Sequence, residues 1–197
     1  MHYDFIEIGT SDFDTILQSP NPGIGLSIEP LKLYLDKLPN VDGVTKINCA
    51  ISYIDGFVDV YWIDPDDISK HNLPDWLRGC NSIIKPHPTA HGELAVRNLL
   101  DIYNKTQCET ITWKTLVERY NVESVKYLKI DTEGHDCAIL NNILDCNLEI
   151  YPDEILFENN VLTNHEESNK TIDRLLNIGY TIINRNPDNI HIKFNKN

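Results

Sequence analysis

The sequence predicts an α/β fold: a mostly parallel sheet with helices on both faces and an antiparallel pair of closing strands. Short runs of β-branched and aromatic residues alternate with longer segments of helical period along most of the chain. A length of 197 residues with 41% hydrophobic side chains is enough for one sizeable core. We therefore expect a single domain over residues 1–197.

The first half of the predicted sheet follows from four runs rich in β-branched and aromatic residues. We expect strands at residues 5–8, 25–29, 46–52 and 57–63. Pro30 opens the helix after the second strand, because the first helical N–H needs no partner. Asp55-Gly56 predicts a tight turn between the third and fourth strands.

Between residues 64 and 109 the periodicity fails and prolines recur. We interpret this stretch as an irregular excursion from the core, of the kind in which specificity tends to be built. His87 and His91 are expected in a loop, because Pro88 between them disfavours a helix.

The second half returns to regular alternation. We expect strands at residues 110–113, 125–131, 154–158, 180–184 and 190–194, and helices at residues 114–120, 134–144 and 165–178. The last two strands form the closing pair, with a turn at residues 186–189 between them.

The charge balance argues against polyanionic partners. With 17 Lys and Arg against 30 Asp and Glu, the net charge of −13 opposes nucleic acid and anionic membrane surfaces. The five cysteines are scattered without a Cys-x-x-Cys pair, which indicates reduced, mostly buried thiols. Because the first residues resemble no targeting segment, we expect a cytoplasmic protein.

Polar and acidic residues follow the first two strands. Gly9 ends the first strand and lets the backbone approach a ligand closely. Glu29 ends the second strand about 20 residues later, where an acidic side chain commonly binds the hydroxyls of an adenosine ribose. Ser11 and Phe13 stand where a dinucleotide fingerprint has glycines, which disfavours a nicotinamide or flavin cofactor.

The motifs FIEIGTSDFDT, SIEP, NCAIS, YLKIDTEGHD and ILFEN, in this order, resemble the FkbM-like methyltransferases, a branch of the class I S-adenosylmethionine-dependent enzymes. The resemblance extends from Phe5 to about Glu158, and KIDTEGHD is its most specific part. The sequence departs from the family pattern at Ser11 and Phe13, where Asn and Gly are commoner, and at Asp136, where the family has Glu.

The resemblance implies a single Rossmann-like class I methyltransferase domain that binds S-adenosylmethionine. The implied cofactor site consists of Glu7, Gly9, Thr10, Ser11, Asp12, Glu29, Pro30, Ala50, Ile51, Ser52 and Asp131. Glu29 would bind the ribose hydroxyls, Ala50 to Ser52 would border the adenine, and Asp131 would face the sulfonium. The excursion would then cover the acceptor, the molecule that receives the methyl group.

Two arrangements could remove the proton of a hydroxyl acceptor. In the first, His135 acts as general base beside Asp131, since the ordinary pKa of histidine suits that work. In the second, a divalent cation such as Mg²⁺ bridges Asp131, Glu158 and Asn159. The second arrangement is similar to that of the catechol O-methyltransferases.

We therefore expect an O-methyltransferase that acts on a carbohydrate or another small polyhydroxyl acceptor. One alternative is a methyltransferase-like module without turnover that serves binding or assembly, which the altered glycine loop favours. Another is a nucleotide-sugar binding protein that transfers no methyl group. The sequence predicts neither the acceptor's identity nor an oligomeric state.

Overall fold

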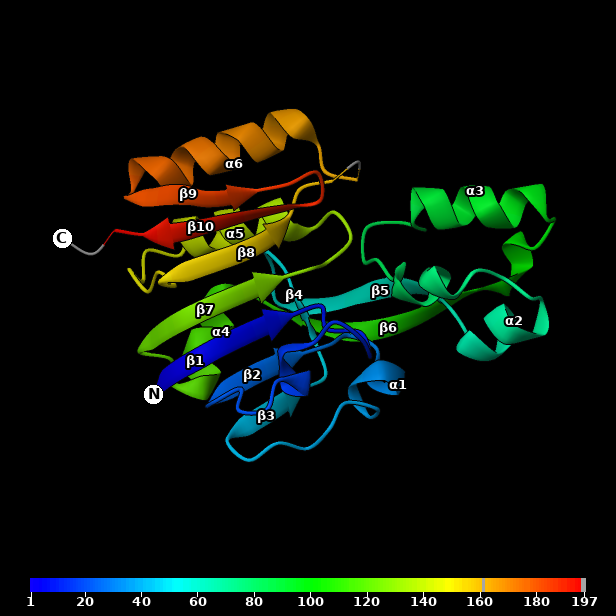
Figure 1. The fold of residues 1–197 in the computed structure, drawn as a ribbon, viewed down its shortest axis with the longest axis horizontal. Helices are drawn as coiled ribbons and strands as arrows, with labels where there is room; N and C mark the ends of the chain where they lie inside the picture. Colours follow the sequence, from blue (N-terminus) through cyan, green and yellow to red (C-terminus); the bar gives the residue numbers. More distant parts are fainter. Residues whose placement is uncertain (161, 196–197) are drawn as a thin grey trace.

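The computed structural model, which describes residues 1–160 and 162–195, is built on a seven-stranded sheet with the strand order β3-β2-β1-β7-β8-β10-β9 (Figure 1). Its strands are β1 (His2–Ile8), β2 (Gly25–Ile28), β3 (Val44–Ile47), β7 (Ser124–Ile130), β8 (Glu154–Glu158), β9 (Tyr180–Arg185) and β10 (Asn189–Phe194). Neighbouring strands from β3 to β8 are parallel, and β10 runs antiparallel to both β8 and β9. This confirms the predicted mostly parallel sheet with an antiparallel closing pair.

The order of the strands reverses next to β1. The chain moves outward from β1 through β2 to β3, and later returns to β7 on the other side of β1. In open parallel sheets, ligands bind beyond the carboxyl ends of the strands at such a reversal. We therefore expect a ligand-binding site at the carboxyl ends of β1 and β7.

Helices cover both faces of the sheet, but unequally. The long helices α4 (Trp113–Tyr120), α5 (Asp136–Asp145) and α6 (His165–Asn177) pack on the face that carries Ile6 and Ile8 of β1. Phe5 points to the opposite face, because side chains alternate along a strand. There it packs against residues of the short helices η1 (Ile16–Gln18) and α1 (Lys32–Leu35).

A second sheet, with the order β4-β6-β5, corrects the prediction for residues 46–63. It consists of β4 (Ala50–Ile51), β5 (Gly56–Ile63) and β6 (Tyr103–Ile111). β4 and β5 both pair with β6, so Asp55-Gly56 does not close a hairpin between neighbouring strands. The predicted strand at 46–52 divides at Asn48, whose side chain donates to the carbonyls of Glu29 and Pro30 while the chain passes between the sheets.

The predicted excursion is more regular than its sequence indicated. Residues 103–109 belong to β6, although their sequence is mostly polar, because the strand is fixed by its pairing with β5. The remainder, residues 64–102, is called the outer segment below. It contains α2 (Pro65–Lys70), η2 (Asp75–Gly79), α3 (Pro88–Val96) and η3 (Leu100–Ile102).

The loop predicted around Pro88 is wrong. Pro88 is the first residue of α3, a position where the missing N–H costs nothing, and His87 is its N-cap. A small apolar cluster holds the outer segment together; its buried members are Ile63, Ile68, Leu73, Leu77, Cys80, Ala90 and Leu94.

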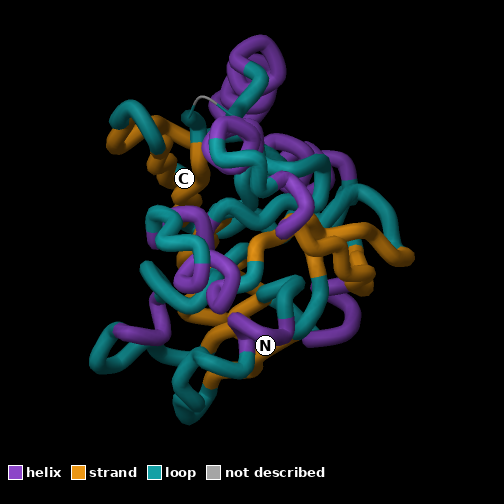
Figure 2. Tube along the Cα trace, turned by 90° about the vertical axis from the view of Figure 1, so that its right-hand side faces the viewer, coloured by secondary structure: helices purple, strands orange, loops and turns teal. Residues whose placement is uncertain are grey.

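The outer segment lies beyond the carboxyl ends of the parallel strands. In Figure 1 the arrows of β1, β2, β7 and β8 point toward it, and the N-terminus and the end of β10 lie at the other end. Figure 2 views the molecule from the side of the outer segment, where loops and helical turns dominate.

One prediction from composition concerns the cysteines. All five cysteines are free, and four of them are buried, as predicted. Among the described residues, no helix combines the length and apolar character needed to cross a membrane.

Candidate active site

A cavity opens where the ends of β1, β2 and β7 meet, and its volume is about 710 Å³ including the open mouth. Ligand sites of proteins commonly have about 300–1,000 Å³. Eight residues predicted for the cofactor line it together: Gly9, Thr10, Ser11, Glu29, Pro30, Ala50, Ile51 and Asp131. The fold thus brings four distant parts of the sequence to one cavity.

Gly9 is required by the close approach of β1 to β7. Its φ of +80° lies in the left-handed region, and a Cβ at this position would stand 1.9 Å from the carbonyl oxygen of Asp131. Any other residue would push the two strand ends apart. The glycine therefore sets the shape of the cavity floor.

Glu29 holds the loops on both sides of β2. Its carboxylate accepts hydrogen bonds from the backbone N–H of Ser11 at 2.8 Å and of Leu31 at 2.9 Å. Burial raises the pKa of Glu29 to about 7, against the opposing effect of these hydrogen bonds. The predicted ribose-binding carboxylate is thus held in a fixed orientation at the cavity wall.

Three residues predicted for the cofactor do not line this cavity. Glu7 is fully buried, where it accepts from the hydroxyl of Thr15 and the N–H of Ile16. Asp12 turns toward Lys37 and Arg78. Ser52 hydrogen-bonds His135 instead, at 3.0 Å. Glu7 therefore stabilises the loop that follows β1, because its carboxylate accepts both of these hydrogen bonds from that loop.

The outer segment forms a wall of the cavity. Gly79, Asn81, Ser82 and Ile83 line it opposite the strand ends. The ring of Phe13 fills the space beside Gly79, where a Cβ would stand 2.7 Å from the ring, and the guanidinium of Arg78 lies over that ring at 4.8 Å. In the loop that follows β1, the residues with a left-handed backbone are Ser11 and Asp14. Phe13 therefore needs no glycine-like conformation.

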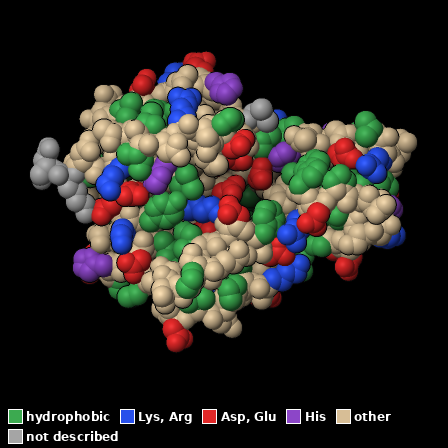
Figure 3. Space-filling model, in the orientation of Figure 1, with side chains coloured by type: hydrophobic (Ala, Val, Ile, Leu, Met, Phe, Trp, Pro, Cys, Tyr) green, Lys and Arg blue, Asp and Glu red, His purple; other side chains and the backbone are tan. Residues whose placement is uncertain are grey.

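Three carboxylates gather at the mouth of the cavity: Asp131 and Glu133 line it, and Glu158 lies beside them. Ligand atoms of Asp131, Glu133 and Glu158 all lie within 4.8 Å of one another. Figure 3 shows acidic side chains around the hollow between the main sheet and the outer segment. Burial, followed by the charges of neighbouring carboxylates, raises the pKa of Asp131 to about 7 and that of Glu158 to about 9.

The side-chain oxygen of Asn159, predicted as a metal ligand together with Asp131 and Glu158, is engaged outside this cluster. Its side-chain oxygen accepts from the hydroxyl of Ser168 in α6, and its backbone N–H donates to Asp188. Because neighbouring residues at a strand end point in opposite directions, Asn159 turns toward α6 while the carboxylate of Glu158 approaches Asp131 and Glu133. Glu133 takes the third place in the cluster.

Asp136, which departs from the family pattern, fixes the turn after β7. Its buried carboxylate accepts from the N–H and the hydroxyl of Thr132 and from the N–H of Glu158. Burial raises its pKa to about 6. Asp136 thus holds the ends of β7 and β8 in register around the acidic cluster.

Comparison with protein families identifies the fold's relatives. The model of the methyltransferase FkbM domain matches residues 7–182, which is most of the chain. The chain belongs to the FkbM methyltransferase family. Comparisons with curated proteins and with solved structures gave no match. Membership in this family makes the chain a methyltransferase by descent and confirms the predicted Rossmann-like α/β fold.

His135, predicted as the general base of this methyltransferase, lies outside the cavity. It is buried in a neighbouring recess that Ser52, Tyr53 and Ala138 also line. Burial lowers its pKa to about 4, so the ring is neutral at physiological pH. The structure does not bring His135 together with Asp131, because the turn at Gly134 directs the ring toward β4.

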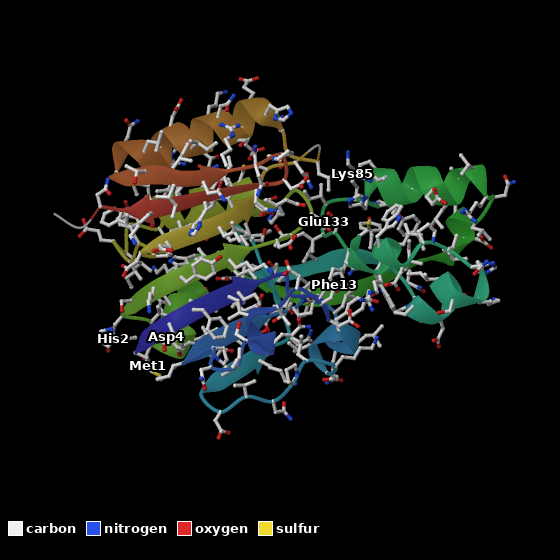
Figure 4. The ribbon with its side chains drawn as sticks, viewed as in Figure 1. Met1, His2, Asp4, Phe13, Lys85 and Glu133 are labelled. Carbon is white, nitrogen blue, oxygen red and sulfur yellow. The ribbon has the colours of Figure 1, made fainter. Side chains whose placement is uncertain are left out.

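The methyltransferase has two residues at this site that the predicted set lacked: Glu133, which lines the cavity, and His87, which contacts Glu133. Glu133 lies within the KIDTEGHD motif, so its motif could have indicated it. His87 of the outer segment reaches Glu133, with 3.1 Å between Nε2 and Oε2. Figure 4 shows Glu133 and Phe13 between the main sheet and the outer segment. No sequence pattern indicated that His87 would meet Glu133.

Proposed function

We propose that the chain is an S-adenosylmethionine-dependent O-methyltransferase that acts on a hydroxyl of a carbohydrate or another polyhydroxyl acceptor. One observation carries the proposal: Glu29, Asp131 and Glu133 line a single cavity, at the ends of β2 and β7, and Glu158 at the end of β8 lies beside the last two. An adenosyl ligand needs a ribose-binding carboxylate at one end, and a hydroxyl acceptor needs a proton-accepting group at the other.

The cavity fits the cofactor in its chemistry. Glu29 would bind the ribose hydroxyls, and Gly9 and Thr10 offer close backbone contact to the amino-acid part. The apolar side chains that would enclose the adenine are Cys49, Ala50, Val60 and Ile83. When bound, S-adenosylmethionine supplies an electrophilic methyl group, and the chain's residues align the acceptor with it.

The acidic cluster would act on the acceptor. An attacking hydroxyl must lose its proton, and a carboxylate of the cluster can accept it. The same three carboxylates, Asp131, Glu133 and Glu158, are the oxygen donors that Mg²⁺ prefers, so a bound cation is the alternative way to activate the hydroxyl. Chelation distinguishes these two mechanisms. Loss of turnover with EDTA and its recovery with Mg²⁺ would show that a bound cation, and not a proton-accepting carboxylate alone, activates the hydroxyl.

The acceptor class follows from the polarity of the cavity mouth. Carboxylates that line the cavity offer hydrogen bonds to hydroxyl groups, whereas the net charge of −13 repels polyanionic acceptors. A neutral polyhydroxyl molecule matches both conditions. No basic groove for nucleic acid and no membrane attachment enters this proposal.

The first test is cofactor binding followed by transfer. We expect isothermal titration calorimetry to detect binding of both S-adenosylmethionine and S-adenosylhomocysteine. A ligand concentration of 100 times the dissociation constant should raise the free energy of unfolding by roughly 2.7 kcal/mol. A panel of neutral mono- and oligosaccharides incubated with methyl-labelled cofactor should then contain a labelled product. Binding without any labelled product would favour a binding or assembly module, and stabilisation by nucleotide sugars alone would favour the third interpretation.

A substitution at Asp131 tests which end of the cavity holds the reacting methyl group and the acceptor. Asp131→Asn should lower turnover by more than it lowers cofactor affinity, because Asp131 lies at the acidic cluster and away from Glu29. Turnover is measured as labelled product per minute and affinity by calorimetry. Equal losses in both quantities would contradict a place for Asp131 at the reacting end.

A further inference from the structure

Glu133 faces the cavity, and a buried histidine from another part of the chain holds its carboxylate. The Oε2 atom of Glu133 lies 3.1 Å from Nε2 of His87, whose side chain is 8% exposed. Glu133 belongs to the turn after β7, and His87 to the outer segment. The contact therefore joins the two walls of the cavity at its acidic mouth.

The hydrogen-bond network fixes which nitrogen of His87 carries the proton. Nδ1 accepts a hydrogen bond from the backbone N–H of Ala90 and so caps α3. A nitrogen that accepts carries no proton, which leaves the hydrogen on Nε2. His87 therefore donates to Glu133, and its ring is held by the helix that it caps.

The backbone of Glu133 is held in an uncommon conformation. Its φ of +53° lies in the left-handed region, where a long side chain is disfavoured, and Gly134 follows at +97°. Asp136 fixes the same turn through its hydrogen bonds to Thr132. Backbone strain of this kind persists where the surrounding structure enforces it, and it concentrates at functional sites.

The other candidate base does not face the cavity. His135 lies in the neighbouring recess and hydrogen-bonds Ser52. Within the acidic cluster, Asp131 and Glu158 have no imidazole to hold them among the contacts of the described residues, whereas Glu133 has His87. Glu158 accepts from the side chain of Asn160 but does not line the cavity. Glu133 therefore combines a place in the cavity lining with an orientation that His87 holds.

We propose that Glu133 binds the acceptor's hydroxyl and accepts its proton, and that His87 is the residue that positions Glu133. This inference rests on the proposed O-methyltransferase function. The acceptor oxygen forms a bond to the methyl carbon, the bond from that carbon to sulfur breaks, and S-adenosylhomocysteine leaves as a neutral thioether. The hydroxyl proton passes to the carboxylate of Glu133, so atoms and charge balance.

Two substitutions separate catalysis from folding. Glu133→Gln keeps the side-chain shape but removes the proton acceptor, so kcat for the labelled saccharide should fall by about 10²- to 10⁴-fold. His87→Asn keeps a residue that caps helices well but is too short to reach Glu133. It should lower kcat about tenfold while the melting temperature and the affinity for S-adenosylhomocysteine stay at wild-type values.

His91→Asn is the matched control. His91 is exposed, on the same helix one turn later, and its ring stacks on Tyr103 instead of reaching the cavity. We expect wild-type kcat from this variant. Equal losses in His91→Asn and His87→Asn would show that any change in α3 disturbs the site, and would overturn the positioning role of His87.

Nitrogen NMR of the imidazole rings gives an independent readout. In the wild-type protein, the His87 ring should show a proton on Nε2, and its Nε2 signal should shift in Glu133→Gln. A proton on Nδ1, or an unchanged signal, would overturn the contact. If the wild-type protein binds no S-adenosylhomocysteine or labels no saccharide, the proposed function is rejected. Labelling that persists in Glu133→Gln within threefold of wild type would reject only the role of Glu133.

Discussion

The two walls of the cavity are stabilised in different ways. At the strand ends, buried carboxylates hold the loops by accepting backbone N–H groups: Glu7 holds Ile16, Glu29 holds Ser11 and Leu31, and Asp136 holds Thr132 and Glu158. The outer segment is held by an apolar cluster, and its polar contacts to the strand ends include His87 with Glu133 and Arg78 with Asp12.

This difference separates two tasks. Directional hydrogen bonds to buried carboxylates set backbone positions closely, which suits the side that would contact a cofactor common to many enzymes. Apolar packing is non-directional and tolerates substitution while volume is kept. The outer segment can therefore change its surface, and with it the acceptor, without altering the strand ends.

The largest expected effect comes from comparing a glycine of each wall. Gly9→Ala should destabilise the protein by at least about 3 kcal/mol, roughly 6–12 °C in Tm, because its Cβ would collide with the carbonyl of Asp131. Gly92 lies exposed inside α3 with nothing near its Cβ, so Gly92→Ala should stabilise by about 0.5–1 kcal/mol. Thermal unfolding measures both, and a similar sign for the two variants would contradict the comparison.

The second effect concerns the cofactor side alone. Glu29→Ala should weaken binding of S-adenosylhomocysteine by about 1–3 kcal/mol, because charge-assisted hydrogen bonds to the ribose and to the Ser11 loop are lost. Glu93→Ala removes an acidic residue of the outer segment that pairs with Arg97, and it should leave the affinity unchanged. Isothermal titration calorimetry measures both affinities. Wild-type affinity in Glu29→Ala would show that Glu29 does not bind the cofactor.

The strand-end half of the site was predictable because local rules specify it. Gly9, Glu29 and Asp131 each end a strand that the hydrophobic pattern reveals, and parallel strands bring their carboxyl ends together. The outer half was not predictable in this way. Gly79 lines the cavity only because Phe13, distant in sequence, fills the space beside it. The sequence could not show that Asn159 contacts Ser168 and that His135 contacts Ser52, because side-chain direction depends on the turns that follow β8 and β7.

A third prediction tests the electrostatics of the cavity mouth through pH. Because burial raises the folded-state pKa of Glu158 to about 9, the folded protein keeps a proton that the unfolded chain loses above its ordinary pKa of 4.5. This contribution to stability is complete below that value and is lost as pH rises toward 9. Asp131 acts in the same direction toward pH 7.

Glu158→Gln imitates the protonated form at every pH. The Tm of the wild-type protein should therefore fall more between pH 5.5 and pH 8.5 than that of the variant, by roughly 2–4 °C for each kcal/mol that the retained proton contributes. Parallel curves for the two proteins would mean that Glu158 is ionised in the folded state at neutral pH, and that the cluster is less buried than it is here.

The smallest effect concerns the attachment of the outer segment to the strand ends. Arg78→Met removes the charge over the Phe13 ring and near Asp12 but keeps an unbranched side chain that packs on the ring. The loss should be about 0.5–1 kcal/mol and local, because exposed cation–π contacts have that magnitude. Hydrogen exchange of residues 75–83 should accelerate about two- to fivefold, while the Ser11 and Leu31 amides held by Glu29 keep wild-type rates.

Arg97→Met, which breaks only an exposed pair with Glu93, is the control and should change neither set of exchange rates. Faster exchange at Ser11 in Arg78→Met would show that the two walls open together, and the division between a fixed cofactor side and an independently variable acceptor side would then be wrong.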